Sequence, residues 1–247
     1  MGSHRGSGVM AGGEGMTELE PKPQAKKSDL GVRTASAIVM VALAGTALWL
    51  GGWVFVAFAV LIGIGVYFEW CGLVWRFVES AWGRWLWLAT GLLYIGGSLW
   101  SLIGLRHFWI QPALLVIALV IGIDVGAYFF GKTFGGPKIA PRISPSKTWA
   151  GLLGGVVGAA LVQVTNGFFN PRGLSNLSSV LGVIVLILTS CAFAITAQAG
   201  DFFQSWMKRR AGVKDSGNFI PGHGGLFDRV DGLLALLWLF GWAYGAF

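Results

Sequence analysis

Three polar residues recur at helical spacing where a long apolar run of the sequence ends. If the helix of that run continues past Gly200, then Asp201, Ser205 and Lys208 lie at positions i, i+4 and i+7 and share one face. A carboxylate, a hydroxyl and an ammonium group then point in one direction. Such a set can bind a metal ion together with phosphate oxygens, which indicates phosphate chemistry at this end of the helix.

Two further carboxylates, Asp228 and Asp231, begin the next apolar run and share a helix face at i and i+3. Unpaired, they would repel each other and would be costly in an apolar setting. A divalent cation resolves both problems, so we predict that Asp201, Asp228 and Asp231 bind Mg²⁺. The alternative is a structural ion network in which Asp228 pairs with Lys208 or Arg229.

A turn rich in Gly and Pro separates these two groups of carboxylates. Its glycines expose backbone N–H groups and allow close approach of a phosphate. His223 lies in this turn, where it either contacts phosphate, acts as a base or only makes a hydrogen bond. The polar residues of the connection that we take as candidates are Arg209, Lys214, Asp215 and His223.

A second polar cluster lies between residues 132 and 148, in another connection between apolar runs. It contains four cations, and we expect Ser146, Lys147 and Thr148 to open the following helix, whose N-terminus favours anions. Asp124, inside the preceding apolar run, is either a core polar contact or a further carboxylate near the metal. The candidate phosphate-binding residues of this cluster are Arg142, Ser144, Ser146 and Lys147.

The elements that position these residues are membrane helices. Of the 247 residues, 55% are hydrophobic and only 12% are charged, which is about half the charged share of soluble domains. We therefore predict an all-α polytopic membrane bundle, with a disordered tail over residues 1–30 and a single transmembrane domain over residues 31–247. Seven spans are expected at about 34–51, 53–69, 84–102, 108–130, 148–167, 178–200 and 224–245. Residues 70–83 are expected to form a short interfacial helix.

Most of the 18 Lys and Arg residues fall in alternate connections, which sets the expected orientation. The positive-inside rule places the N-terminus and both polar clusters in the cytoplasm, in a multi-pass protein of the inner membrane. We expect no nucleic-acid partner. Small residues at i and i+4 (Gly151 with Gly155, and Gly154 with Gly158) are typical of close helix packing.

At this point the sequence resembles a known family. The residues from Ser205 to Asp231, together with Asp124–Tyr128 and Ser144–Thr148, look like the recurring motifs of the CDP-diacylglycerol synthases, also called phosphatidate cytidylyltransferases. One position departs from the family, because Ala150 stands where an acidic residue is common.

The resemblance implies an all-helical membrane enzyme that forms a homodimer. It implies transfer of a cytidylyl group from CTP to phosphatidic acid, which yields CDP-diacylglycerol and pyrophosphate. It also implies a centre at Asp201, Asp228 and Asp231 that holds Mg²⁺ and additionally K⁺.

The residue types suit that reaction, which joins two polyanions and depends on positioning and charge neutralisation. Lys208, Arg209 and Lys214 would hold the triphosphate, and Ser205 would donate to a phosphate oxygen. The second cluster would bind either the lipid phosphate or the nucleotide. The alternatives are a CTP-dependent polyprenol kinase, a cation-coupled transporter and a structural scaffold.

Overall fold

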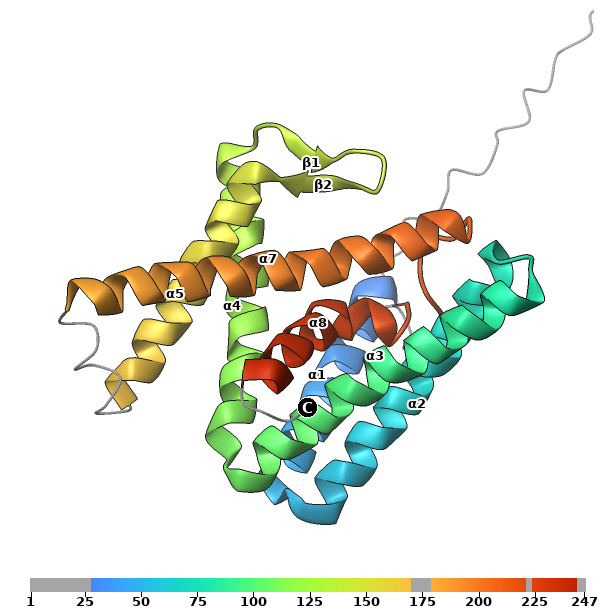
Figure 1. Ribbon diagram of the computed structural model, residues 1–247, viewed down its shortest axis with the longest axis horizontal. Helices are drawn as coiled ribbons and strands as arrows, with labels where there is room; N and C mark the ends of the chain where they lie inside the picture. Colours follow the sequence, from blue (N-terminus) through green and yellow to red (C-terminus); the bar gives the residue numbers. More distant parts are fainter. Residues whose placement is uncertain (1–27, 170–178, 221–223, 244–247) are drawn as a thin grey trace, which may run out of the picture.

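The computed structural model describes residues 28–169, 179–220 and 224–243, and all statements below concern these residues. The chain forms seven long helices and one β-hairpin (Figure 1). The helices are α1 (Ser28–Leu50), α2 (Gly52–Phe77), α3 (Ala81–Phe108), α4 (Ile110–Phe134), α5 (Trp149–Phe169), α7 (Val180–Arg210) and α8 (Phe227–Ala243). The strands are β1 (Lys138–Ala140) and β2 (Ser144–Thr148).

The predicted all-α polytopic membrane bundle is confirmed. Six helices, α1 to α5 and α7, are long and apolar enough to cross a bilayer. The seventh predicted span corresponds to α8, which is described over 17 residues. Large apolar side chains cover the outside of the bundle, as lipid-facing helices require; Trp53, for example, is 87% exposed.

The predicted interfacial helix at residues 70–83 is wrong. Helix α2 continues without a break to Phe77, and α3 begins at Ala81 after a short connection. Within the predicted segment, Leu73 and Val74 are buried against the neighbouring helices, although apolar residues of an interfacial helix would face lipid. Their helical spacing was real, but it marks the end of a long span packed inside the protein.

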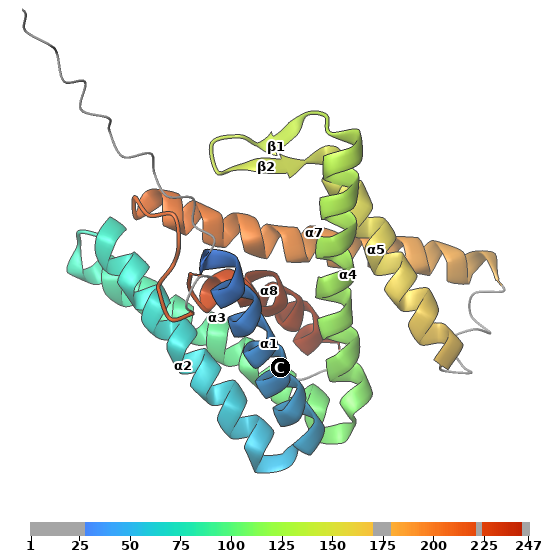
Figure 2. The same ribbon diagram turned by 180° about the vertical axis from the view of Figure 1, so that it is seen from behind.

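Two groups of helices divide the fold. Helices α1, α2, α3 and α8 lie together, while α4 and α5 cross beside them and α7 runs along both groups (Figures 1 and 2). An aromatic cluster joins α2, α3, α7 and α8, because the ring of Trp70 lies within about 6 Å of those of Trp87, Phe203 and Phe227. The end of α7 that carries the polar residues is thereby held against α8.

Glycine packing holds α4 against α5, as the sequence predicted. A Cβ atom added at Gly126 would collide with the carbonyl of Gly154, and one added at Gly158 would collide with the carbonyl of Gly122. The two backbones therefore touch, which only glycine allows. This contact fixes α5 beside the polar part of α4.

The second polar cluster forms a β-hairpin, which differs from the helix start expected at Ser146–Thr148. Strands β1 and β2 pair antiparallel, and α5 begins only at Trp149. The hydroxyl of Thr148 accepts a hydrogen bond from the N–H of Gly151 at 3.0 Å, so Thr148 caps α5. Lys147 thus projects from a strand directly before the helix.

Candidate active site

A polar cavity of about 710 Å³ opens where α4, the hairpin, α5, α7 and α8 meet. Five acidic and five basic side chains line it, so the cavity carries both charges in equal number. The acidic residues are Asp124, Asp201, Asp215, Asp228 and Asp231, and the basic ones are Lys132, Lys138, Lys147, Lys208 and Arg229.

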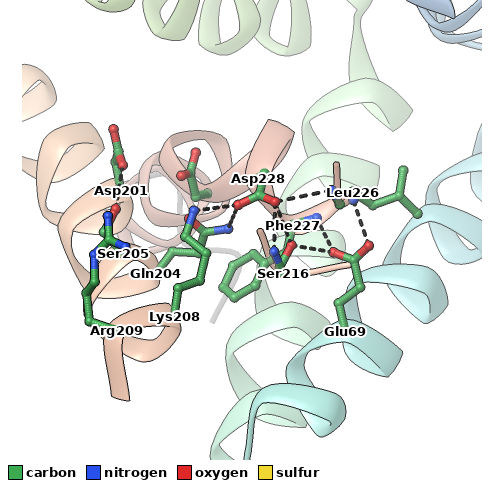
Figure 3. Close-up of polar contacts among 12 residues, drawn as sticks. Glu69, Asp201, Gln204, Ser205, Lys208, Arg209, Ser216, Leu226, Phe227 and Asp228 are labelled. Carbon is green, nitrogen blue, oxygen red and sulfur yellow. Dashed lines mark hydrogen bonds and ion pairs between the residues drawn. The ribbon is translucent and has the colours of Figure 1, made fainter. Parts of the chain in front are cut away.

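The predicted stripe on one helix face is present, because α7 continues through Asp201 to Arg210. The hydroxyl of Ser205 donates to Oδ1 of Asp201 at 3.3 Å, and Lys147 of β2 forms an ion pair with Oδ2 of the same carboxylate. Both ends of this ion pair are largely buried, with 21% and 29% of the side chains exposed. The hairpin is thereby joined to α7 at the cavity (Figure 3 shows the α7 residues).

Asp228 is the centre of a dense hydrogen-bond network (Figure 3). Its Oδ1 accepts from Nε2 of Gln204 and from Nζ of Lys208, each at 2.6 Å. Its Oδ2 accepts from the N–H and the hydroxyl of Ser216 at 2.9 and 3.0 Å, and from the N–H of Gly225 at 3.1 Å. The alternative interpretation, an ion network between Asp228 and Lys208, is therefore present in the structure.

Glu69 of α2 is a site residue that the sequence interpretation missed. Only 4% of it is exposed, and its carboxylate accepts hydrogen bonds from the Ser216 hydroxyl at 2.7 Å and from the N–H groups of Leu226 and Phe227 at 2.9 and 2.8 Å (Figure 3). A lone carboxylate within an apolar span was the available signal, since such residues are costly unless they are paired.

The turn before α8 directs its N–H groups toward protein carboxylates. Those of Ser216 and Gly225 bind Asp228, and those of Leu226 and Phe227 bind Glu69. These four groups are thus engaged within the protein rather than turned to a phosphate. His223 and its neighbours at 221 and 222 lie outside the described residues, so the prediction for His223 stays a prediction.

Not every candidate residue reaches the cavity. Lys147, Ser146 and Asp215 line it, whereas of the described residues Ser205, Arg209, Arg142, Ser144 and Lys214 are not part of the lining. Nε of Arg209 instead donates to the carbonyl of Ile143 at 3.3 Å, which ties the end of α7 to the hairpin.

Two glutamines of α7, which the sequence interpretation also missed, line the cavity from within the bundle. Gln198 and Gln204 are 4% and 0% exposed. Among the described residues, no hydrogen-bond partner faces either amide atom of Gln198 or Oε1 of Gln204. These three atoms are buried polar groups without a partner in the described part of the protein, which is energetically costly.

The carboxylates of the polar cavity have the residue type that binds a divalent cation, but several of them already have protein partners. Asp124, Asp201 and Asp231 are close enough for their charges to act on one another. Within the described ranges, no group of three or more Asp, Glu, His or Cys side chains has the arrangement of a metal site. Two carboxylates completed by water and substrate phosphate are nevertheless a usual set for Mg²⁺. Asp201 contacts Lys147 and Ser205, and Asp231 accepts the N–H of Gly232, so both have fewer protein contacts than Asp228, which accepts five hydrogen bonds.

A charged cavity enclosed by membrane helices defines a class of integral membrane protein that handles a polar substrate within the bilayer. Comparison with known proteins narrows this class. A family model described as "Cytidylyltransferase family" matches residues 76–247. The chain therefore belongs to the cytidylyltransferase family.

Curated relatives agree with that assignment. The chain is 36% identical to the phosphatidate cytidylyltransferase of Brucella melitensis, over 87% of this chain and 94% of the relative. It is 37% identical to the protein of the same name from Rickettsia bellii, over 85% of this chain and 88% of the relative. The matches span the cavity residues on α4, β2, α7 and α8.

Proposed function

We propose that the protein is a phosphatidate cytidylyltransferase, which transfers the cytidylyl group of CTP to phosphatidic acid. The observation that carries the proposal is the polar cavity, which places lysines and carboxylates together within a membrane bundle. Family membership and the names of the relatives support the same activity. The products would be CDP-diacylglycerol and pyrophosphate.

In this reaction a phosphate oxygen of the lipid forms a bond to the α-phosphorus of CTP. The bond from that phosphorus to the oxygen bridging to the β-phosphate breaks, and pyrophosphate leaves with the electron pair. The protein must hold two polyanions at one place and neutralise their charge. Lys147 and Lys208 enter the cavity from opposite elements, β2 and α7, so they can contact different phosphates.

Mg²⁺ would be held by Asp201 and Asp231 and would neutralise charge on the phosphate oxygens. Asp228, the third predicted ligand, could join only by releasing part of its network, with Lys208 the group best placed to move toward pyrophosphate. The equal number of acidic and basic residues in the cavity supports a bound cation, because the lining alone has no excess positive charge for a triphosphate. We include K⁺ in the proposal as an additional cation.

An apolar cavity of about 390 Å³ is a candidate site for an acyl chain of the lipid. It lies between α1, α2, α3 and α8 and is lined by apolar side chains apart from Arg229. Arg229 also lines the polar cavity. A lipid whose tail lay in the apolar cavity would therefore have its phosphate close to a guanidinium, which binds phosphate well.

We place the polar cavity on the cytoplasmic side of the inner membrane, where CTP is available, and we propose a homodimer. The basic hairpin and the basic end of α7 support this orientation, because cytoplasmic connections of membrane proteins are rich in Lys and Arg.

The test is product analysis with purified protein, CTP, phosphatidic acid and Mg²⁺. Lipid-linked CMP and pyrophosphate are expected in equal amounts, and Asp231→Asn should abolish both. Release of CDP with a phosphorylated polyprenol would instead identify a lipid kinase. Cation uptake into proteoliposomes without nucleotide turnover would identify a transporter. Either result would overturn the proposal.

A further inference from the structure

We propose that Glu69 is a positioning residue for the active site: it fixes the loop before α8 and, through Ser216, orients Asp228 and Lys208. This inference rests on the proposed function for its kinetic test. Glu69 lies before residues 76–247, which the family model matches.

The carboxylate of Glu69 binds the start of α8 directly. Its Oε1 accepts the N–H of Leu226, and its Oε2 accepts the N–H of Phe227. The first N–H groups of a helix have no partner within the helix, and a negative charge there is favourable. A side chain of α2 therefore does for α8 what an N-cap residue normally does, across 158 positions of sequence.

Ser216 links Glu69 to Asp228. Its hydroxyl lies 2.7 Å from Oε2 of Glu69 and 3.0 Å from Oδ2 of Asp228, and its N–H donates to the same Oδ2 at 2.9 Å. A hydroxyl has one hydrogen, so it can donate fully to only one carboxylate at a time. The position of Ser216, and with it two of the contacts of Asp228, therefore depends on where Glu69 holds the hydroxyl.

The loop is pressed against Glu69 from both sides. A Cβ atom at Gly217 would lie 2.5 Å from Oε1 of Glu69, and one at Gly225 would lie 2.5 Å from Oε2. Neither distance is possible for real atoms, so the loop can enclose the carboxylate only with glycine at both positions. The enclosure leaves little freedom for residues 216–217 and 225–227 while the carboxylate is in place.

The influence of Glu69 on the cavity passes through Oδ1 of Asp228, the oxygen that does not contact Ser216. Oδ1 of Asp228 holds Nζ of Lys208, and both residues line the polar cavity. A carboxylate held by the loop on one side thus sets the position of the ammonium group on the other. Glu69 itself is not part of the described cavity lining, so it acts only through these neighbours.

Glu69→Gln is the decisive change because it keeps the shape and removes one acceptor. Both oxygens of Glu69 accept from backbone N–H groups, and an amide nitrogen would face one of those donors in either orientation. Glu79→Gln is the matched control, since Glu79 is an exposed carboxylate just beyond the same helix.

The experiment compares wild type, Glu69→Gln, Glu79→Gln, Ser216→Ala and the Glu69→Gln/Ser216→Ala double variant by steady-state kinetics and by hydrogen–deuterium exchange. For Glu69→Gln we expect kcat to fall about tenfold to hundredfold, as for loss of hydrogen bonds to a charged group, with the KM for phosphatidic acid nearly unchanged. Exchange should rise in residues 213–220 and 224–232 but not in α4 and α5. Ser216→Ala should lower kcat in the same direction, and its effect should not add to that of Glu69→Gln.

Unchanged kcat in Glu69→Gln, or faster exchange spread over all helices, would overturn the inference, the latter because it indicates a general packing role. If Glu69→Gln cannot be purified folded, Ser216→Ala carries the same test, and wild-type kinetics from it would also overturn the inference. Absence of turnover in wild type would instead count against the proposed function, and the exchange measurement would still report on the loop.

Discussion

Nζ of Lys208 lies 2.6 Å from Oδ1 of Asp228, and only 16% and 10% of the two side chains are exposed. This ion pair joins α7 to α8 beside the cavity, and Gln204 donates to the same oxygen. Breaking such a pair by removing one partner leaves the other charge buried and unpaired.

Lys208→Met should therefore destabilise the protein by about 3–5 kcal/mol and abolish turnover. The measurement is chemical denaturation in detergent beside an activity assay. Lys214→Met is the control for stability, because Lys214 is exposed, and it should unfold like wild type. A Lys208→Met protein of wild-type stability would show that the pair contributes nothing to the fold.

Gly126→Ala should weaken the contact between α4 and α5, because the added methyl group meets the backbone of Gly154. Overpacking of this kind costs about 1–3 kcal/mol and would displace Asp124 relative to Lys147. The melting temperature and the specific activity should both fall. Gly96→Ala is the matched control, since nothing lies within 4 Å of a Cβ at Gly96. Equal melting temperatures for the two variants would contradict the packing argument.

Gln198→Met tests whether the contents of the cavity bind the buried amide. A buried amide without partners costs about 1–3 kcal/mol, so methionine, of similar length, should raise the melting temperature of the empty protein. Activity should fall, because the substrate loses its contact. The readout is the thermal shift caused by CTP, which should be smaller in the variant. A variant with full activity and an unchanged shift would show that Gln198 contacts no substrate.

Ala44→Phe would place an aromatic ring in the apolar cavity, which Ala44 lines from α1. The KM should rise for phosphatidic acid with long acyl chains and much less for a short-chain form, since only the long chain needs the space. Ala35→Phe, at an exposed position of the same helix outside that lining, should behave like wild type. An equal effect of Ala44→Phe on both lipids would argue against an acyl-chain site.

Asp231→Asn should reduce the affinity for Mg²⁺, because one of the two carboxylates proposed as ligands loses its charge. Chelation of Mg²⁺ should stop wild-type turnover, and added Mg²⁺ should restore it. Direct calorimetric titration of the protein with Mg²⁺ is the independent readout. Equal binding of Mg²⁺ by wild type and Asp231→Asn would remove Asp231 from the metal site.

Residues that act within one helix were predictable from sequence. Asp201, Ser205 and Lys208 share a face because the helical repeat puts them there, and α7 does continue through them. The glycines of α5 recur at i and i+4, and this spacing likewise predicted close packing against another helix. Such patterns depend only on local geometry, which the sequence contains.

Contacts between distant segments were not predictable in the same way. The Ser216 hydroxyl donates a hydrogen bond to Glu69, which lies 147 positions earlier in the sequence. The residues around Glu69 give no indication of this partner. Ser146–Thr148 were expected to open a helix, but they belong to strand β2, and only Thr148 caps the helix that follows. The end of α2 was misplaced since an apolar repeat does not distinguish burial in protein from burial in a lipid interface.

The position of Asp124 along α4 bears on how the membrane stays closed to ions around the polar cavity. Asp124 lines the polar cavity ten residues before the end of α4, or about 15 Å along the helix, a length equal to about half of a hydrocarbon layer of about 30 Å. Further along the same helix Ala113, Val116 and Leu119 are fully buried, and from Ala113 to Ile123 α4 has no polar side chain. In the proposed enzyme, this apolar stretch would separate the polar cavity from the opposite side of the membrane.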